Sequence, residues 1–432
     1  MPTSEETRGL KPVVSVSKAK AVEAAVYPIL AGWGSKQSSA TEMTQRAIDL
    51  VEPRSIQAGY ILSQHGFNAY CETRDAGGAL EAMEQALEIS TLWEDENLKA
   101  RTLVNTAIVE AYELQLESAI SHCRQAIMLS ERLDRLRSLV EAHNYLLHAS
   151  LLSGKRGTTK KHIKPMIAHA EHLRNHIWMI VAYDYAVTAE IWEGNWDSAR
   201  QYSDRALNVL ASHVGHLATR GFLELMAGET RTGVNYIHQA LEHCQNMTPQ
   251  ATQRWAIACE AIAASARISG DHEWFDQAEL IARVVTCSAD TCDYFALKGE
   301  FALGIAALQR ADAVSAEKLY VALTKRKERR LKLSATMSLP RLLAHLNRLR
   351  GGASELTIEL FEEAVSFAQD RGFRPELAWS CLEYGEVLLC RRTPDDRENA
   401  MALLEKASSI ASRLSMKLLL SKITRVIAKT KS

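Results

Sequence analysis

Three histidines near the middle of the chain have the spacing of metal ligands. His169, His172 and His176 stand at i, i+3 and i+7, so one continuous helix would present them on the same face, with His162 just upstream. Imidazole nitrogens at this spacing can share a zinc ion. The sequence contains no HExxH motif, which excludes a zinc-protease site of that kind. We therefore expect a polar helix face here, with neither a metal nor a cofactor.

Two other motifs suggest chemistry that their surroundings do not support. The sequence GKRGTT lacks the GxxxxGK[ST] spacing of a phosphate-binding loop, and it falls between two expected helices with no β-strand before it. Cys287 and Cys292 are close in sequence, but no further metal ligands stand nearby. No nucleophile–base pair and no supported pair of carboxylates stands out. We predict that the protein is not an enzyme.

A basic run in the C-terminal half is opposed by Glu328 alone. Such a run can bind nucleic-acid phosphates or an acidic protein surface. A solvated helix end stabilised by the helix dipole is the simpler explanation, and both stay open. The run consists of Lys325, Arg326, Lys327, Arg329, Arg330 and Lys332.

The overall composition limits the classes of partner. The net charge is −1 with 24% charged residues, so no global charge favours nucleic acid or membranes, and direct nucleic-acid binding is the less favoured alternative. The eight cysteines contain no CxxC pair, which is typical of reduced thiols in a cytosol. The polar, acidic start is no signal peptide, and no apolar run reaches the roughly 18 residues of a membrane span. We expect a soluble cytoplasmic protein without membrane contact.

The stretch from Ala186 to Leu210 reads as one helical hairpin. A helix ends at Glu193, a turn follows at Gly194 and Asn195, and a second helix continues to the end of the stretch. Glycine can take the left-handed conformation that closes a helix. In the second helix, Ala199 and Ala206 lie seven residues apart on one face, where small side chains allow close packing against the first helix.

The same small-residue pattern recurs along the whole chain. Ala206 and its equivalents are alanine in every hairpin but one, and most positions seven residues earlier are small as well. Repeated helix–turn–helix units at this period predict an all-α fold, a right-handed α-solenoid of about ten hairpins. The marker positions are Ala47, Ala86, Ala126, Ala168, Ala206, Ala240, Ala282, Leu323, Ala364 and Ala407.

The pattern also predicts the organisation of the chain. Residues 1–17 form a flexible tail, residues 18–414 the repeat array, and residues 415–432 a capping helix and tail. Pro28 should kink or end the first helix, and the sequence RRTPDDREN should enlarge the last turn. The fourth hairpin is irregular, and we expect its second helix to begin near Pro165, because proline suits the first position of a helix.

The paired helices resemble tetratricopeptide repeats, in the Ala-x6-Ala second helix, the Gly-Asn and Gly-Asp turns and the 34-residue step from Ala206 to Ala240. The longer average period departs from that family. The segment FEEAVSFAQDRGFRPELAWSCLEYGEVLL is similar to the helical-repeat region of large bacterial ATP-binding regulators, the LuxR-type activators and the cyclase-linked ATPases. That resemblance implies a non-catalytic scaffold, the sensor or coupling module of a signalling or transcriptional regulator. Its partner would be a protein or peptide, such as an ATPase or DNA-binding subunit.

In tetratricopeptide arrays the first helix of each pair lines the concave face. Carrying that register over gives a wall of mixed charge and aromatic rings, as a peptide or small-ligand groove requires. A nucleic-acid-associated regulator that uses residues 325–332 is the alternative function. The predicted wall consists of Gln64, Asn68, Arg101, Tyr112, His143, Asp184, Thr188, Trp192, Glu260, Arg267, Lys298 and Gln309.

Overall fold

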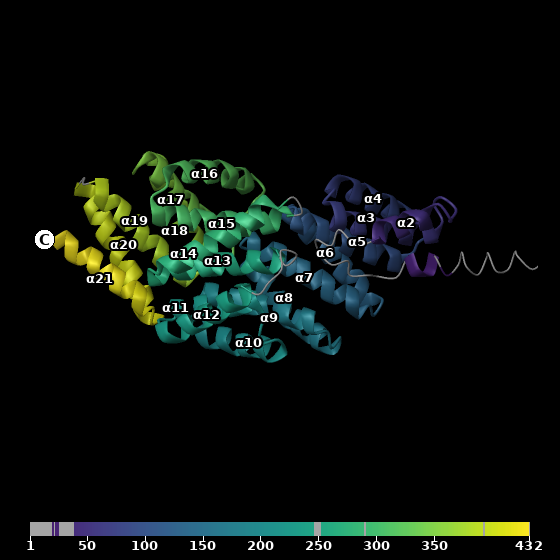
Figure 1. Ribbon diagram of the computed structural model, residues 1–432, viewed down its shortest axis with the longest axis horizontal. Helices are drawn as coiled ribbons and strands as arrows, with labels where there is room; N and C mark the ends of the chain where they lie inside the picture. The colour runs from purple at the N-terminus through teal and green to yellow at the C-terminus, as the bar shows by residue number, and fades with distance from the viewer. Residues whose placement is uncertain are drawn as a thin grey trace, which may run out of the picture. The chain divides into compact units, whose positions relative to one another are not determined.

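The computed structural model describes residues 20, 22–25, 39–245, 252–288, 291–391 and 394–431. In these residues every regular element is a helix, and the only β-pairing is an isolated bridge between Leu333 and Ser338. The predicted all-α fold of stacked hairpins is confirmed (Figure 1). The contacts divide the chain into two compact units, residues 1–145 and 146–432.

The helices follow one another with short turns. The first unit contains α2 (Ala40–Ile48), α3 (Ile56–Thr73), α4 (Ala76–Leu92), α5 (Glu96–Tyr112) and α6 (Leu116–Arg132). The division falls within α7 (Leu136–Leu152). The second unit contains α8 (Arg156–His172), α9 (His176–Glu193), α10 (Trp196–Val209), α11 (Val214–Met226), α12 (Thr230–Gln245), α13 (Thr252–Ser269), α14 (His272–Cys287), α15 (Asp293–Arg310), α16 (Ala313–Glu328), α17 (Leu339–Gly351), α18 (Glu355–Arg371), α19 (Arg374–Arg391), α20 (Pro394–Arg413) and α21 (Lys417–Lys431).

Local sequence signals set the helix ends. The side chain of Asn175 precedes α9 and accepts hydrogen bonds from the backbone N–H groups of Ile177 (3.0 Å) and Trp178 (3.2 Å). Such a cap satisfies N–H groups that have no partner inside the helix. Gly194 then closes α9 with a φ of 72°, the left-handed conformation predicted from the sequence.

The alanine register is confirmed in all hairpins except the fourth. Every marker position is buried but Ala168, which is exposed. The expectation that the second helix of this hairpin begins near Pro165 is wrong, because α8 begins at Arg156 and Pro165 lies inside it. The buried positions of α8 that match the register are therefore Thr159 and Met166.

Other expected boundaries also shift or lie outside the described residues. The predicted enlarged turn is mostly helix, because α20 begins at Pro394 and carries Asp395 and Asp396 in its first turn. Acidic residues in that place suit the positive end of the helix dipole, which explains the early start. The expected tail at residues 1–17 and the break at Pro28 lie outside the described residues.

Unit 2 closes on itself through contacts between the region of α9 to α12 and its C-terminal helices. The indole Nε1 of Trp196 donates to the carbonyl oxygen of Leu414 at 2.7 Å, and Arg374 Nε donates to the carbonyl of Glu193 at 2.7 Å. Lys417, at the start of α21, pairs with Glu229 in the turn between α11 and α12. Figure 1 draws one end of α21 beside α11. In an open solenoid each repeat contacts only its neighbours. The second unit is therefore a closed array.

The segment between α16 and α17 completes the closure. The backbone N–H groups of Lys332 and Leu333 donate to the carbonyl of Leu152, at 2.9 and 3.0 Å. Further along the segment, the N–H of Thr336 donates to the carboxylate of Glu260 at 3.0 Å. The interior of unit 2 is thus filled by its own chain.

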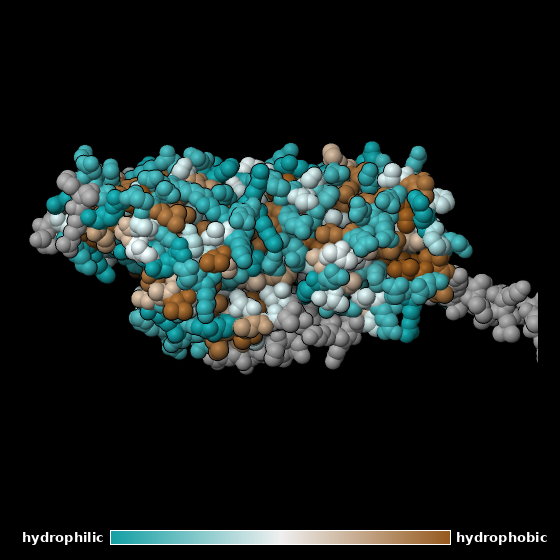
Figure 2. Space-filling view, turned by 90° about the horizontal axis from the view of Figure 1, so that it is seen from above, coloured by the Kyte–Doolittle hydropathy of each residue, from teal (hydrophilic) through white to brown (hydrophobic). Residues whose placement is uncertain are grey.

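The surface is largely polar. Figure 2 shows a face on which hydrophilic residues predominate and hydrophobic residues are visible in separate areas. The most exposed large apolar side chains include Val314, Met128 and Ile177. None of the described helices has the length and hydrophobicity that crossing a membrane requires.

Candidate functional site

In unit 1, hydrogen bonds connect three of the predicted wall residues. The side-chain amide of Gln64 donates to Asn68 Oδ1 at 2.8 Å, and Gln64 Oε1 accepts a hydrogen bond from Arg101. Tyr112 contacts Tyr145 edge-on with ring centres 5.7 Å apart. His143 is buried on α7. The helices α3 and α5, each the first of its pair, thus bring Gln64, Asn68 and Arg101 together.

Arg101 combines fixed side-chain contacts with partial exposure. Its guanidinium is held by Gln64 and lies 5.9 Å from the ring centre of Tyr60, yet the residue stays partly exposed. Burial lowers the pKa of Arg101, while the nearby Glu141 opposes that shift. A fixed, partly exposed arginine beside aromatic rings is typical of a binding surface.

In unit 2 two predicted wall residues pair with each other instead of facing a groove. Lys298 Nζ lies 2.9 Å from Glu260 Oε2, and both side chains are buried. Lys298 also donates to Ser334 Oγ at 3.0 Å, and Ser334 donates to Glu260 at 2.6 Å. Although burial opposes it, the Glu260 carboxylate raises the pKa of Lys298.

The remaining predicted residues of unit 2 lie apart. The Asp184 carboxylate bonds to His216 Nδ1, and Arg267 pairs with Glu383 at 2.9 Å. Thr188 is half-buried, and Gln309 is exposed near the end of α15. These positions do not form one continuous wall.

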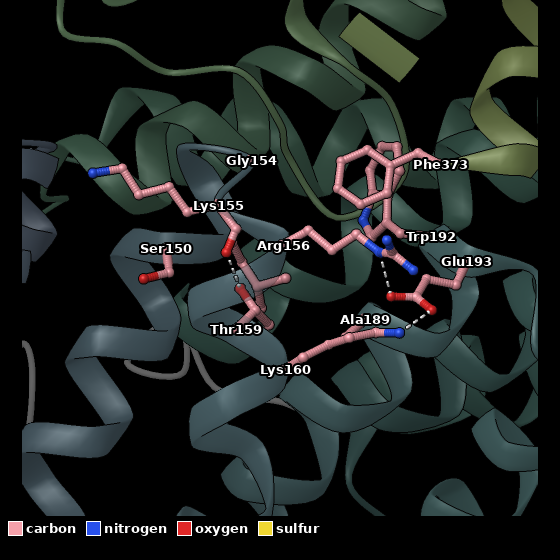
Figure 3. A pocket seen from close by; sticks show the side chains of 11 residues that line it. Ser150, Gly154, Lys155, Arg156, Thr159, Lys160, Ala189, Trp192, Glu193 and Phe373 are labelled. Atoms are coloured by element: carbon pink, nitrogen blue, oxygen red, sulfur yellow. Dashed lines mark hydrogen bonds and ion pairs between the residues drawn. The ribbon is translucent and has the colours of Figure 1, made fainter. Parts of the chain in front are cut away.

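Trp192 belongs to a small pocket at the start of α8 (Figure 3). Its ring packs against Phe373, with ring centres 5.2 Å apart, and the residue is only 4% exposed. Figure 3 shows the side chains of Arg156 and Lys160 reaching the carboxylate of Glu193, at 2.8 and 2.6 Å. Burial opposes ionisation of Glu193, but these two partners lower its pKa.

This pocket suits a water molecule better than a ligand. Its cavity volume is about 10 Å³, close to the smallest space that holds one water. Within the described residues, Trp192 Nε1 and Ser150 Oγ have no hydrogen-bond partner, so a water would satisfy them. Of the two cations in GKRGTT, Arg156 is paired with Glu193.

The basic run is mostly neutralised by acidic partners. Arg326 donates to Glu300 at 2.6 Å, Arg326 and Arg329 pair with Asp293, and Lys327 and Lys332 share Glu363 at 2.5 and 3.0 Å. Lys325 and Arg330 are exposed. The sequence could not reveal these partners, because they come from other helices.

The histidines do not share a helix face. His169 and His172 lie on α8, and His176 begins α9 after an intervening turn, so the expectation of one continuous polar face is wrong. The turn forms because Arg174 takes a positive φ of 51°. In the part of the chain that the structure describes, no group of three or more His, Cys, Asp or Glu residues could hold a metal.

A second charged cluster was missed by the sequence reasoning. Glu383 on α19 lies 2.7 Å from His345 Nε2, 2.9 Å from Arg267 and 3.7 Å from Arg341 Nε. Burial would raise the pKa of Glu383, but its three neighbours hold it well below the ordinary value. The i, i+4 spacing of Arg341 and His345 is the one local signal, and it gives no hint of their partner.

The paired helices, packed through small residues and stacked in sequence, define a tetratricopeptide-like helical-repeat protein. No family model matches the sequence, and no curated protein matches it significantly. Among solved structures, the chain is similar to the Rap protein in its complex with competence and sporulation factor. The alignment covers 76% of this chain and 89% of the Rap protein, with 14% sequence identity and a TM-score of 0.52.

A second similar structure is a circular tandem repeat protein with novel repeat topology and enhanced subunit contact surfaces. The alignment covers 95% of this chain and 97% of the tandem repeat protein, with 14% sequence identity and a TM-score of 0.21. The likeness to the Rap protein concerns the fold. The resemblance to LuxR-type regulators stays a prediction from the sequence.

Proposed function

We propose that the protein is a non-catalytic scaffold that binds a protein or peptide partner. Within that role, it would be the sensor or coupling module of a signalling or transcriptional regulator, with an ATPase or DNA-binding subunit as its partner. The observation that carries the proposal is the fixed, partly exposed Arg101 on the inner helices of unit 1.

The inner face of unit 1 is the favoured partner surface for a physical reason. Unit 2 fills its interior with its own ion pairs, such as Glu260 with Lys298. In unit 1, Arg101 and the partly exposed Tyr60 and Tyr112 come from α3 and α5. Arginine and tyrosine dominate binding energy at many interfaces, because they bury large planar surfaces at little entropic cost.

The similar fold supports this role in general terms. The Rap protein was solved in complex with competence and sporulation factor, so a helical-repeat chain of this kind accommodates a bound partner. The identity of 14% leaves the partner of the present chain to experiment.

The second candidate function is that of a nucleic-acid-associated regulator. It depends on Lys325 and Arg330, which are exposed at the end of α16 and just beyond it. Their neighbours are largely paired with Asp293, Glu300 and Glu363, which weakens the attraction for phosphates. We therefore rank this function second.

Affinity capture from the native host tests both functions. The wild-type chain, Arg101→Ala and the double variant Lys325→Gln/Arg330→Gln serve as baits, with Arg124→Ala as matched control. Arg124 is an exposed arginine on α6, the second helix of its pair. We expect Arg101→Ala to weaken capture of the main partner by about tenfold, as for an interface anchor. The other two variants should behave as wild type.

Two outcomes would contradict the ranking. If Arg101→Ala captures the main partner as well as wild type does, the inner face of unit 1 is excluded as the partner surface. Nucleic acid captured by wild type and lost in the double variant, most clearly at low salt, would favour the alternative function.

A further inference from the structure

A second pocket lies inside unit 2, between α11 and α13 on one side and α17 and α19 on the other. Helices α11 and α13 contribute one side, with Phe222 and Met226 as apolar walls and Arg267 at the rim. The start of α17 and helix α19 contribute the other side through Arg341 and Trp379. The cavity volume is about 20 Å³, which is enough for one water or for the oxygens of a carboxylate. The pocket therefore combines apolar walls with hydrogen-bond donors.

Several of these donors have no acceptor. Trp379 is 6% exposed, and among the described residues its Nε1 has no hydrogen-bond partner. Arg341 is 5% exposed, and its Nε and Nη1 likewise lack a hydrogen bond within the described chain. Glu376 lies 3.2 Å from Nη1 of Arg341, and Glu383 lies 3.7 Å from its Nε. These carboxylates offset the charge of Arg341, but neither forms a hydrogen bond with those two nitrogens. Buried donors are nearly always satisfied in folded proteins, so an acceptor must reach them.

The charges around the pocket favour an anionic acceptor. Arg267 and Arg341 line it, and Lys422 Nζ lies 5.1 Å from the ring centre of Trp379. Against these cations, Glu383 is firmly ionised, because His345, Arg341 and Arg267 outweigh burial and hold its pKa low. Burial raises the pKa of Glu376 and of Glu386, a third carboxylate that interacts with Arg267 and Lys422, and so favours their neutral forms. The donors of Arg341 and Trp379 that lack a hydrogen bond within the described chain are therefore suited to an anionic acceptor.

We propose that this pocket binds the carboxylate of an organic ligand, with Trp379 Nε1 and the guanidinium groups of Arg341 and Arg267 as donors. Arginine is well suited to this role, because its planar fork matches the carboxylate. The cavity has room for the carboxylate oxygens alone, so the carbon skeleton would extend out of it past the apolar side chains that line it, such as Met226 and Met337. The proposal rests on the binding role proposed above, and it gives the scaffold a ligand to sense. The carboxylate can belong to a free organic acid or to the C-terminus of a peptide.

Three related probes separate these sources in calorimetric titrations of the purified full chain. 4-Methylpentanoate carries the carboxylate and an aliphatic chain, as a free acid does. N-acetylleucine adds the peptide unit of a C-terminal residue, and N-acetylleucinamide removes the charge. We expect a carboxylate probe to bind at least about tenfold more tightly than the amide, because a charge-assisted hydrogen bond is lost with the charge. Tighter binding of the first probe indicates a free acid, and tighter binding of the second a peptide terminus.

Substitutions then assign the binding to the pocket. Trp379→Phe removes one N–H and keeps the ring, so it should weaken the better carboxylate probe by about tenfold. Arg267→Gln, at a partly exposed position, is a second variant if the first does not fold. Trp274→Phe, a buried tryptophan on α14 outside the pocket, is the matched control and should bind as wild type.

Equal binding of the acid and amide probes, or no binding of any probe, would overturn the proposal. So would undiminished binding by folded Trp379→Phe and Arg267→Gln variants. These titrations need no protein partner. A failed partner capture with successful titration would therefore refute the scaffold function alone, and the reverse result would refute the carboxylate site alone.

Discussion

At the scale of single residues, the inner face of unit 2 is organised by buried charges that satisfy one another. Glu260 accepts hydrogen bonds from Ser334 and from Thr336 and pairs with Lys298, so its carboxylate is fully surrounded by donors. Charges removed from water are stable only with such compensation. The register of the sequence places Glu260 and Lys298 on inner helices, but it carries no information on partners 38 to 76 residues away.

Breaking this pair should strongly destabilise the protein. Lys298→Met leaves the buried Glu260 carboxylate without its cation, and we expect the free energy of unfolding to fall by about 3–5 kcal/mol. Urea denaturation followed by circular dichroism measures the change. The double variant Glu260→Leu/Lys298→Met should recover part of the loss, because neither charge remains.

An exposed pair provides the control for this prediction. Arg132 pairs with Glu96, and the two side chains are 60% and 45% exposed. Arg132→Ala should change the free energy of unfolding by less than about 1 kcal/mol, because water screens such a pair. A similar loss in Arg132→Ala and Lys298→Met would contradict the argument from burial.

At the scale of helices, much of the fold could be predicted because each hairpin repeats one local packing rule. Ala199 and Ala206 lie against α9 as expected, and the same register holds from Ala47 to Ala407. It fails in α8, where helix begins before Pro165 and continues through it. Packing of Ile163, Met166 and Ile167 against neighbouring helices outweighs the local cost of the proline, and a local rule cannot foresee that.

This internal proline predicts a stabilising substitution. Pro165→Ala restores a backbone N–H and relieves the clash with the preceding turn, so we expect the free energy of unfolding to rise by about 1–3 kcal/mol. The melting temperature followed by circular dichroism should increase. Pro340→Ala is the matched control, since Pro340 stands at the start of α17, where proline is compatible with the helix. A gain in the control equal to that of Pro165→Ala would refute this explanation.

At the scale of the whole chain, the closure of unit 2 could not be predicted. It depends on bonds such as Trp196 with Leu414 and Arg267 with Glu383, which join residues 218 and 116 positions apart. The periodicity of the sequence describes neighbours and predicts an open groove. The predicted wall residues of unit 2 follow the same division. The register located Arg267, for example, but its partner Glu383 depends on the closure.

The closure predicts a long-range effect of removing the last helix. A chain that ends at Met416 lacks α21, whose Lys422 Nζ donates to the carbonyl of Arg267 on α13 at 3.0 Å. Amide hydrogen exchange should therefore become faster in α13 and α19 as well as in α20, because all three contact α21. Mass spectrometry of peptic fragments resolves these helices.

A point substitution separates this effect from loss of one surface pair. Lys417→Ala breaks only the exposed bond to Glu229, and exchange in α13 should stay as in wild type. Faster exchange confined to α20 in the truncated chain would mean that the unit behaves as an open array.

The closure also limits how this protein can change in evolution. An array whose repeats contact only their neighbours can duplicate or lose a hairpin, because the remaining contacts are unaffected. In unit 2, an added hairpin between α10 and α19 would move Trp196 away from Leu414 and Leu152 away from Lys332. The number of hairpins is therefore set by the circumference of the unit, and variation in length is expected at loops instead.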